Sequence, residues 1–407
     1  MTDIKPHTKK IIAVTGIGVV TPYGIGMASL YEGLLAGKSC LVPAKNIFPN
    51  FEGTTATVST LGDLNNSPDF RHSRSDRLAM VAAEDAVAEL DRQQSWFRES
   101  GVVMASTVGG LSEIDPTIMQ NPSAWYRQKQ GLARARTYAV GHVATSVGKH
   151  FALEGPCCAV SVACASGGMA IALAANMLLD GEAPMVLAGG SDALCPFTLS
   201  GFNALQSLDK EPCRPFDQHR KGLNIGEGAA VLVLETLDAA VARGAKVLGT
   251  LRGWAMTNDA THPTAPQKQG LGMADCINRA MQMAQASADD IGFVNAHGTG
   301  TPLNDIAEAN AYDIVFRERS RPIPVSSTKS YFGHCLGSAG AIEAAITLAS
   351  IQSETIFPTL RLTNPIPSAS VDWVRDTVRH QPVGMGMSVS LGFGGSNAVL
   401  IFGSAPA

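Results

Sequence analysis

Residues 160–168 read Val-Ser-Val-Ala-Cys-Ala-Ser-Gly-Gly, and they join a strand-like run, Val160 to Ala163, to an Ala-rich helical run, Met169 to Leu179. A second strand-like run, Met185 to Ala188, follows after Gly181. Strands of apolar and β-branched residues that alternate with helices are typical of α/β folds, in which helices cover buried sheets. This stretch therefore predicts a strand, a helix and a second strand within one layered unit.

The same alternation continues on both sides of this stretch. In the second half of the chain, Ile323 to Ser326 leads through the loop around His334 into a helical run, Ala339 to Ile351, which repeats the type of unit seen at Cys164. This echo indicates two related halves. No Pro-rich or Gly/Ser-rich linker separates them, so we expect the halves to be tightly joined. Further strand-like runs are Ile11 to Val14, Val102 to Ala105, Ala230 to Leu234 and Phe293 to Ala296.

Composition and charge exclude several classes of protein. The chain has 407 residues, is 45% hydrophobic and carries a net charge of −4, with 16% charged residues. Such a chain can bury a large core, but it offers no cationic surface broad enough to hold nucleic acid by its phosphates. Nowhere do 18 apolar residues follow one another without interruption, so we expect no membrane span.

The cysteines indicate a reducing compartment. Eight cysteines in 407 residues are sparse, and none forms a C-x-x-C pair. This pattern argues against a zinc site and against a disulfide framework. The apolar stretch Ile11 to Val20 follows two lysines but contains Gly16 and Gly18 and has no small-residue cleavage site after it, so it fits a buried strand better than a signal peptide. We expect a cytoplasmic protein.

Cys164 is a candidate nucleophile because it stands between a strand and a helix whose first turn holds Ser166, Gly167 and Gly168. Small residues there let a substrate approach the backbone. The helix dipole contributes only about 0.3 to 1 kcal/mol, which is less than one pH unit on a thiol pKa near 8.5. A reactive cysteine at this position therefore needs a basic or cationic partner, and an inert buried cysteine remains the alternative.

Two histidines lie in Gly-flanked loops that follow strand-like runs, His297 in Asn-Ala-His-Gly-Thr-Gly-Thr (295–301) and His334 in Tyr-Phe-Gly-His-Cys (331–335). Ligand sites in α/β sheets form at the ends of strands. Each histidine alone fits a hydrogen-bonded structural role. Together with Cys164 they form a Cys/His/His set, in which a neutral imidazole donates to an oxyanion or takes a thiol proton.

Charged and Gly-rich segments complete this candidate set. Lys329 precedes His334 by five residues, and its cation would keep an adjacent imidazole neutral. Asp305 and Glu343, surface acids by default, are candidate counter-ions for Lys329 or partners that orient a histidine. The turn Gly-Phe-Gly-Gly-Ser-Asn (392–397) brings backbone N–H groups to a ligand oxygen and would complete an oxyanion hole with the amide of Cys164. A plain hairpin turn is the alternative.

These motifs, in this order, resemble those of elongating β-ketoacyl-acyl-carrier-protein synthases of the type II systems, members of the thiolase superfamily. The resemblance covers nearly the whole chain. The segments that carry it are Val-Ala-Cys-Ala-Ser-Gly (162–167), Arg-Pro-Phe-Asp (214–217), Gly-Glu-Gly-Ala (226–229), Asn-Ala-His-Gly-Thr-Gly-Thr (295–301), Thr-Lys-Ser (328–330), Gly-His (333–334) and Gly-Phe-Gly-Gly-Ser-Asn (392–397).

The resemblance implies a thiolase-type layered α/β/α/β/α fold with two pseudo-symmetric halves. Residues 1–245 would form the half that carries the nucleophilic cysteine, and residues 246–407 the half that carries both histidines and the Gly-rich turn. It also implies a dimer, either a homodimer or a heterodimer with a chain-length-factor-like subunit. The resemblance further implies acyl carrier protein as the partner that carries the substrates.

The resemblance also implies roles for single residues. Cys164 would hold the acyl chain as a thioester, while His297 and His334 would stabilise the enolate that malonyl decarboxylation produces. The amides of Cys164 and Phe393 would form the oxyanion hole, with Phe393 also acting as a gate. Lys329 would support the loop of His334, paired with Glu343, and no metal or redox cofactor would be needed. The residues implied in substrate binding are Thr299, Thr301, Gly392, Gly394, Glu343 and Asp305.

The reaction implied is the decarboxylating Claisen condensation of an acyl thioester with malonyl-acyl-carrier-protein, in fatty-acid or polyketide elongation such as aryl polyene synthesis. A chain-length partner without chemistry, a CoA-dependent thiolase and a cysteine hydrolase are the competing interpretations. Departures such as Val162 and Ser338 bear on acyl length and substrate polarity, which the sequence does not determine. The basic residues expected to dock the acidic carrier, or else to form ordinary solvated surface, are Arg74, Arg77, Arg127, Lys129 and Lys210.

Overall fold

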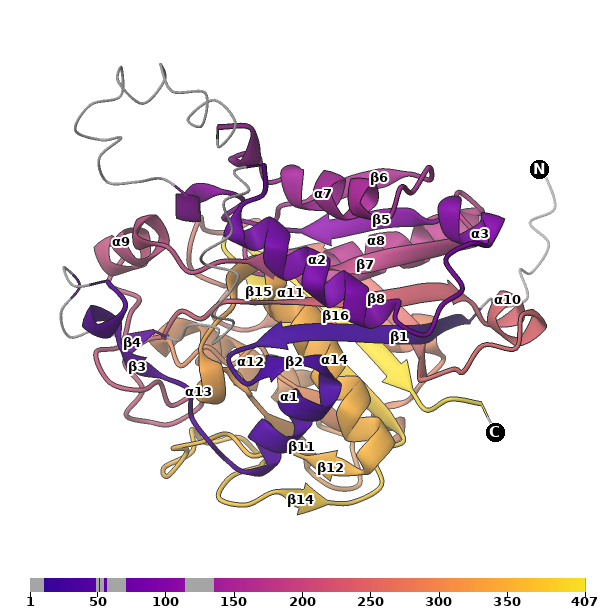
Figure 1. The fold of residues 1–407 in the computed structure, drawn as a ribbon. Helices are drawn as coiled ribbons and strands as arrows, with labels where there is room; N and C mark the ends of the chain where they lie inside the picture. Colours follow the sequence, from indigo (N-terminus) through magenta and orange to yellow (C-terminus); the bar gives the residue numbers. More distant parts are fainter. Residues whose placement is uncertain (1–10, 49–50, 52–54, 57–70, 114–134, 407) are drawn as a thin grey trace, which may run out of the picture.

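The computed structural model describes residues 11–48, 51, 55–56, 71–113 and 135–406 (Figure 1). Its sheet strands in the first half are β1 (Ile12–Thr21), β5 (Gly101–Ala105), β6 (Cys157–Val160), β7 (Met185–Asp192) and β8 (Gly228–Thr236). In the second half they are β9 (Gly249–Asn258), β10 (Ile291–Asn295), β11 (Ile323–Ser326), β13 (Val371–Trp373), β15 (Met385–Gly392) and β16 (Ser396–Gly403). The short strand β2 (Gly24–Ile25) pairs with β1, and two small ribbons pair β3 (Val42–Pro43) with β4 (Thr55–Ala56) and β12 (Thr355–Ile356) with β14 (Arg379–His380).

The helices alternate with these strands. They are α1 (Gly26–Leu35), α2 (Arg74–Ala86), α3 (Ser95–Arg98), α7 (His142–His150), α8 (Ser166–Asp180), α9 (Pro196–Ala204), α10 (Leu237–Ala242), α11 (Leu271–Ala284), α12 (Pro302–Val315), α13 (Lys329–Phe332) and α14 (Ala339–Ser353). Each strand-like run expected from the sequence lies at least partly in a strand. The expected strand over 160–163 is wrong beyond Val160, because the chain turns there and Ala163 takes a positive φ of 45°.

The strand order shows that the two halves repeat one pattern. The order is β13-β11-β10-β15-β16-β9-β1-β8-β7-β5-β6. Outward from the β9/β1 junction, each half has two antiparallel pairs followed by parallel pairs, two in the first half and three in the second. At the junction, only Ile12–Val14 pairs with Gly249–Leu251. The prediction of two pseudo-symmetric halves is confirmed, and the division at residue 245 stays a prediction.

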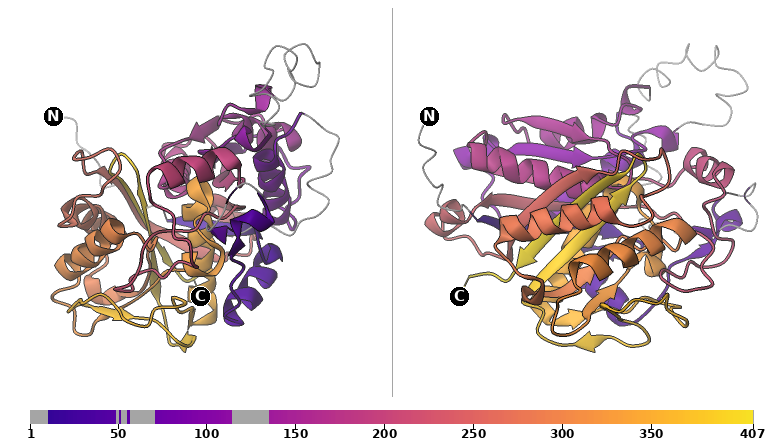
Figure 2. Two further views of the ribbon diagram at one scale, coloured as in Figure 1. Left: turned by 90° about the vertical axis from the view of Figure 1, so that its left-hand side faces the viewer. Right: turned by 180° about the vertical axis from the view of Figure 1, so that it is seen from behind.

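Burial of the helices defines the layers. Helices α8 and α14 lie in the middle of the molecule, in one core cluster with strands from both halves of the sheet. Helices α2 and α7 cover the outer face of the first half, and α11 and α12 cover the outer face of the second, each with a core of its own. Figure 2 shows these helices stacked on either side of the strands. The layered α/β/α/β/α prediction is therefore confirmed.

One described helical stretch, Ala163–Asp180, is long and apolar enough to cross a membrane by length and composition. It coincides with α8, and 67% of it is buried inside the protein. The apolar composition of this stretch is thus accounted for by packing in the middle layer, where small residues such as Ala170 and Ala174 contact the neighbouring strands and helix.

We expect Gly18→Ala to destabilise the fold, because β1 and α2 approach each other closely at this glycine. A Cβ at Gly18 would lie 1.9 Å from the carbonyl oxygen of Ala82, so α2 would have to move. Overpacking of this kind costs about 1 to 3 kcal/mol of unfolding free energy, measurable by denaturant titration. The matched control is Gly201→Ala in α9, where a Cβ meets nothing within 4 Å. It should raise the unfolding free energy by about 0.5 to 1 kcal/mol. Equal effects of the two substitutions would contradict this account.

Candidate active site

Cys164 lies in a strained turn between β6 and α8. The preceding Ala163 has a φ of 45°, a region that residues other than glycine seldom adopt. The Ser166 hydroxyl holds the turn, since it accepts from the amide of Val162 (2.7 Å) and donates to the carbonyl of Ala163 (2.5 Å). The Cys164 side chain is consequently fixed at the wall of a pocket of about 440 Å³ and keeps 8% exposure.

This pocket brings together residues that are far apart in the chain. Cys164 comes from the first half, and both histidines come from the second. The rings of His297 and His334 lie 5.1 Å apart, centroid to centroid, at an angle of 85°. Residues expected from the sequence that line the pocket are Cys164, His297, His334, Thr299, Thr301, Gly392 and Phe393.

His334 presents an N–H group to the pocket. Its Nδ1 accepts from the amide of Leu336 (3.3 Å), so the proton of the neutral ring resides on Nε2. That Nε2 is buried and has no hydrogen-bond partner among the described residues. Burial, with the Lys329 cation as a second cause, holds the pKa of His334 well below its usual range. The ring is therefore a neutral donor without a partner in the protein.

His297 is held in the same state by Lys329. The Lys329 ammonium donates to Nδ1 of His297 at 3.3 Å, which places the proton of the neutral ring on Nε2. Burial, the Lys329 cation and His334 hold the pKa of His297 well below its usual range. The ammonium also pairs with Glu343, as expected. The ammonium thus contacts the first histidine, and the expected support of the His334 loop by Lys329 stays a prediction.

The two acids named from the sequence serve different purposes. Glu343 is the counter-ion of Lys329, and burial raises its pKa to about 7 despite that cation. Asp305 accepts from the amides of Phe216 (2.7 Å) and Gly300 (3.1 Å) and is fully buried. Asp305 therefore ties together two loops, and neither acid is among the residues that line the pocket.

Glu308 is a site residue that the sequence reasoning missed. Its carboxylate accepts from the amides of His297 (2.9 Å) and Gly298 (2.6 Å), and from the side chains of Asn304 (2.7 Å) and Tyr312 (3.0 Å). Burial raises its pKa to about 8. Glu308 thus fixes the backbone of the His297 loop. The available signal was its place one helical turn after Asp305 in a helix that begins beside the histidine motif.

The Gly-rich turn between β15 and β16 packs against the backbone of Cys164. A Cβ at Gly392 would lie 3.2 Å from the amide nitrogen of Cys164 and 3.0 Å from that of Ala165, so this approach favours glycine. The ring of Phe393 stacks on Phe202 at 5.8 Å, and both rings line the pocket. Gly394 donates its amide to the carbonyl of Pro263 (2.7 Å), away from Cys164.

The structure corrects one of the expected docking residues. Arg74 is only 8% exposed, and its guanidinium binds both carboxylate oxygens of Glu227, at 2.9 and 2.6 Å. A buried and paired guanidinium is unavailable to a carrier protein, so the docking role of Arg74 is wrong. The side chain of Arg77 is 13% exposed and lies 3.4 Å from Glu113. Lys210 is exposed and stays a prediction, while Arg127 and Lys129 lie outside the described residues.

Known families match both halves of the chain. Residues 9–240 match the beta-ketoacyl synthase N-terminal domain, and residues 248–363 match the beta-ketoacyl synthase C-terminal domain. The chain belongs to the β-ketoacyl synthase family. This synthase is 32% identical to the chloroplastic 3-oxoacyl-[acyl-carrier-protein] synthase I of Hordeum vulgare, over 97% of the chain and 89% of the relative. It is also 32% identical to 3-oxoacyl-[acyl-carrier-protein] synthase 2 of Staphylococcus aureus strain COL, over 97% and 98%.

This synthase is also similar in structure to solved ketosynthases. The ishigamide ketosynthase/chain length factor superposes with a TM-score of 0.90 at 29% identity, over 98% of this chain and 100% of that one. A beta-ketoacyl synthase from Burkholderia phymatum superposes with a TM-score of 0.88 at 30% identity, over the same shares. Among the residues that the structure describes, no group of three His, Cys, Asp or Glu side chains could hold a metal ion.

We expect Lys329→Met to raise the pKa of His297. With Lys329 present, protonation of the ring would place a second cation 3.3 Å away. Removing the ammonium removes this repulsion and leaves the Glu343 carboxyl nearby, so the ring should titrate about one to three pH units higher. Histidine NMR across a pH titration measures this, with His297→Gln for assignment. The exposed Lys246→Met should leave the His297 titration unchanged, and a wild-type titration in Lys329→Met would refute the role of the cation.

Proposed function

We propose that this synthase catalyses the decarboxylating condensation of an acyl thioester with malonyl-acyl-carrier-protein, giving 3-oxoacyl-acyl-carrier-protein. The observation that carries the proposal is the meeting of one thiol and two neutral imidazoles in one pocket, where the Nε2 of His334 has no partner in the described chain. Two N–H donors suit an oxyanion that develops on a bound substrate. A hydrolase would need a base for water, and neither ring has a free acceptor nitrogen for that.

In the first step, the acyl group moves from a carrier thioester to Cys164. Burial raises the pKa of the Cys164 thiol to about 12, which outweighs the small effect of the helix dipole. The thiol is therefore protonated in the free enzyme, and we propose that it gives up its proton as it attacks the acyl carbon. The new bond forms between Sγ and the acyl carbon, the carrier C–S bond breaks, and the Cys164 proton passes to the departing pantetheine sulfur. No stable thiolate is required before the substrate binds.

In the second step, the malonyl group loses CO₂. The bond between the carboxylate and the α-carbon breaks, and its electron pair forms the enolate of the remaining acetyl thioester. The Nε2–H groups of His297 and His334 donate to the thioester oxygen as negative charge develops there. Their low pKa values keep both rings neutral at physiological pH, so they stabilise the enolate without protonating its carbon.

In the third step, the enolate carbon attacks the acyl group on Cys164. The tetrahedral oxyanion is held by the amides of Cys164 and Phe393, and the close approach of Gly392 to the Cys164 amide supports this arrangement. Collapse of the intermediate breaks the C–S bond and returns the electron pair to sulfur, which takes up a proton from water. Thr299 and Thr301, hydrogen-bonded to each other at 2.8 Å on the pocket wall, contact the pantetheine arm.

The same proposal covers the partners and the setting of the enzyme. Acyl carrier protein delivers both substrates, and no metal or redox cofactor takes part, because CO₂ loss drives bond formation. One solved neighbour is titled a type II PKS acyl-carrier protein in complex with its ketosynthase bound to the hexaketide, which supports a carrier-bound substrate. It superposes with a TM-score of 0.87 at 28% identity, over 98% of this chain and 100% of that one. We assign the enzyme to the cytoplasm.

Substitution of Cys164 separates the steps. Cys164→Ala should abolish acyl transfer and condensation, measured as acyl-enzyme by mass spectrometry and as 3-oxoacyl product. Cys164→Gln should keep malonyl decarboxylation and lose condensation, because the two histidines remain in place. Condensation at the wild-type rate in either variant would end the assignment. Cys276→Ala, a buried cysteine on α11 outside the pocket, is the control and should retain condensation.

The exposed edge strand β6 predicts that the chain forms a dimer. In the described chain β6 pairs only with β5, and the side chains of Cys157 and Ala159 on it are exposed. An open edge of this kind accepts a further strand from a second subunit. The purified chain should show a native mass of twice 42.5 kDa, and Ala159→Lys should reduce it while Ala242→Lys on α10 should not. A chain that is monomeric alone but forms a 1:1 complex with a chain-length-factor-like subunit would favour the heterodimer instead.

A further inference from the structure

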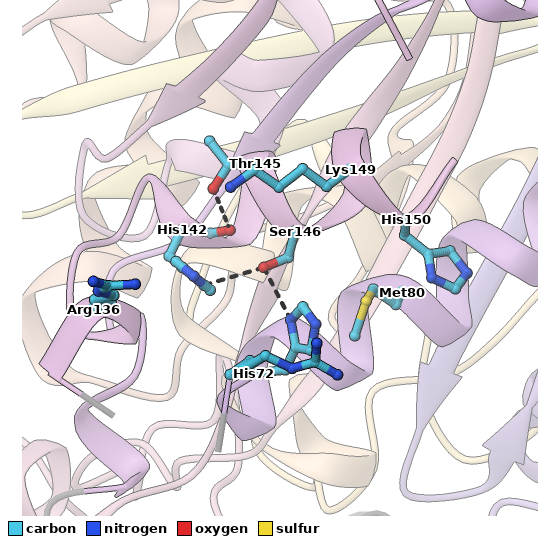
Figure 3. A pocket seen from close by; sticks show the side chains of 9 residues that line it. His72, Met80, Arg136, His142, Thr145, Ser146, Lys149 and His150 are labelled. Carbon is cyan, nitrogen blue, oxygen red and sulfur yellow. Dashed lines mark hydrogen bonds between the residues drawn. The ribbon is translucent and has the colours of Figure 1, made fainter. Parts of the chain in front are cut away.

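A second cavity lies on the outer face of the first half, between α2 and α7. It has a volume of about 420 Å³, and none of the described residues that line it also lines the active-site pocket. Six of the nine described residues that line it carry cationic or protonatable side chains, and Figure 3 shows His142, Lys149 and His150 among them on α7. These six are Arg71, His72, Arg136, His142, Lys149 and His150.

Hydrogen bonds fix part of the cavity wall. The Ser146 hydroxyl is 2% exposed and lies between two imidazoles, 3.3 Å from Nδ1 of His72 and 3.1 Å from Nδ1 of His142 (Figure 3). Nδ1 of His142 also lies 2.9 Å from a carboxylate oxygen of Asp76. Because that carboxylate also caps α2 as a hydrogen-bond acceptor, it holds Nδ1–H of His142 in place. The wall is therefore organised before any ligand binds.

The charge of the cavity is positive, although the chain as a whole carries −4. No acidic side chain is among the described residues that line it. The acids next to it already have partners: Asp76 binds His142 and caps its own helix, and Glu84 binds Arg92 and His150, both at 2.5 Å. Arg136 and Lys149 are exposed and have no such acidic partner among the described residues. A local excess of positive charge is thus concentrated in a concave site.

We propose that this cavity binds the phosphate group of a small phosphorylated molecule, with Arg136 and Lys149 as its charged contacts. A guanidinium binds phosphate oxygens in pairs, and an ammonium adds a compact charge. The volume lies in the range of small-molecule sites, about 300 to 1,000 Å³. The ligand class is a phosphate monoester, and its source is either a nucleotide of the CoA type or inorganic phosphate. The site is separate from the condensation chemistry.

The experiment is calorimetric titration of the full-length protein at fixed ionic strength. The probes are adenosine 3′,5′-bisphosphate, which carries the phosphates of CoA without a pantetheine arm, and inorganic phosphate, with adenosine as the uncharged comparison. We expect the bisphosphate to bind one site per chain. The double variant Arg136→Gln/Lys149→Gln should weaken binding at least tenfold. The charge-matched double variant Arg317→Gln/Lys246→Gln, with both residues exposed and outside the cavity, should bind as the wild type does.

The outcomes separate the possible sources of binding. Displacement of the bisphosphate by inorganic phosphate at similar affinity would support the phosphate site and name the free anion as its ligand. Equal binding by both double variants, or by adenosine alone, would overturn the proposal. A raised KM for the carrier-bound substrate in Arg136→Gln/Lys149→Gln, with bisphosphate binding unchanged, would overturn it in favour of a protein-docking surface. Cys164→Ala should bind the bisphosphate normally, so failure of the condensation mechanism would leave this result unaffected.

Discussion

The buried ammonium of Lys329 is the interaction on which the site depends. A cation without water is costly unless it is paired, and Glu343 provides the pair. The same ammonium donates to His297 and, through its field, disfavours a charge on either imidazole. The Lys329 ammonium therefore sets the tautomer of His297 and, together with burial, keeps both rings neutral.

The layered fold is what makes this arrangement possible. The thiol is held by the turn before α8, whereas Lys329 and both histidines follow strands of the other half. Helices α8 and α14 pack together in the middle layer and so bring the two sets of loops to one pocket. Duplication of one pattern of strands and helices thus supplies a shared interface, at which the two halves contribute different groups.

Two kinds of positive charge coexist on this molecule and behave differently. Arg74 and Lys329 are buried, and each is neutralised by a carboxylate inside the protein, so their effect stays local. The cavity between α2 and α7 keeps its charge toward solvent, because its neighbouring acids pair with His142, His150 and Arg92 and not with Arg136 or Lys149. Whether a basic residue acts inside the protein or on a partner is determined by its burial and its pairing.

The sequence by itself determined the family, the layered α/β class and Cys164, His297 and His334 as candidate site residues. These conclusions rest on short contiguous motifs, which can be recognised without knowing how the chain packs. The tertiary structure alone decided that Lys329 contacts His297, that Arg74 is paired with Glu227, and that Glu308 holds the histidine loop. Arg74 and Glu227 are 153 residues apart, and no local pattern reports such a contact. The packing of whole layers decides which side chains pair over that separation. The residues on either side of a position in the sequence carry no information about this packing.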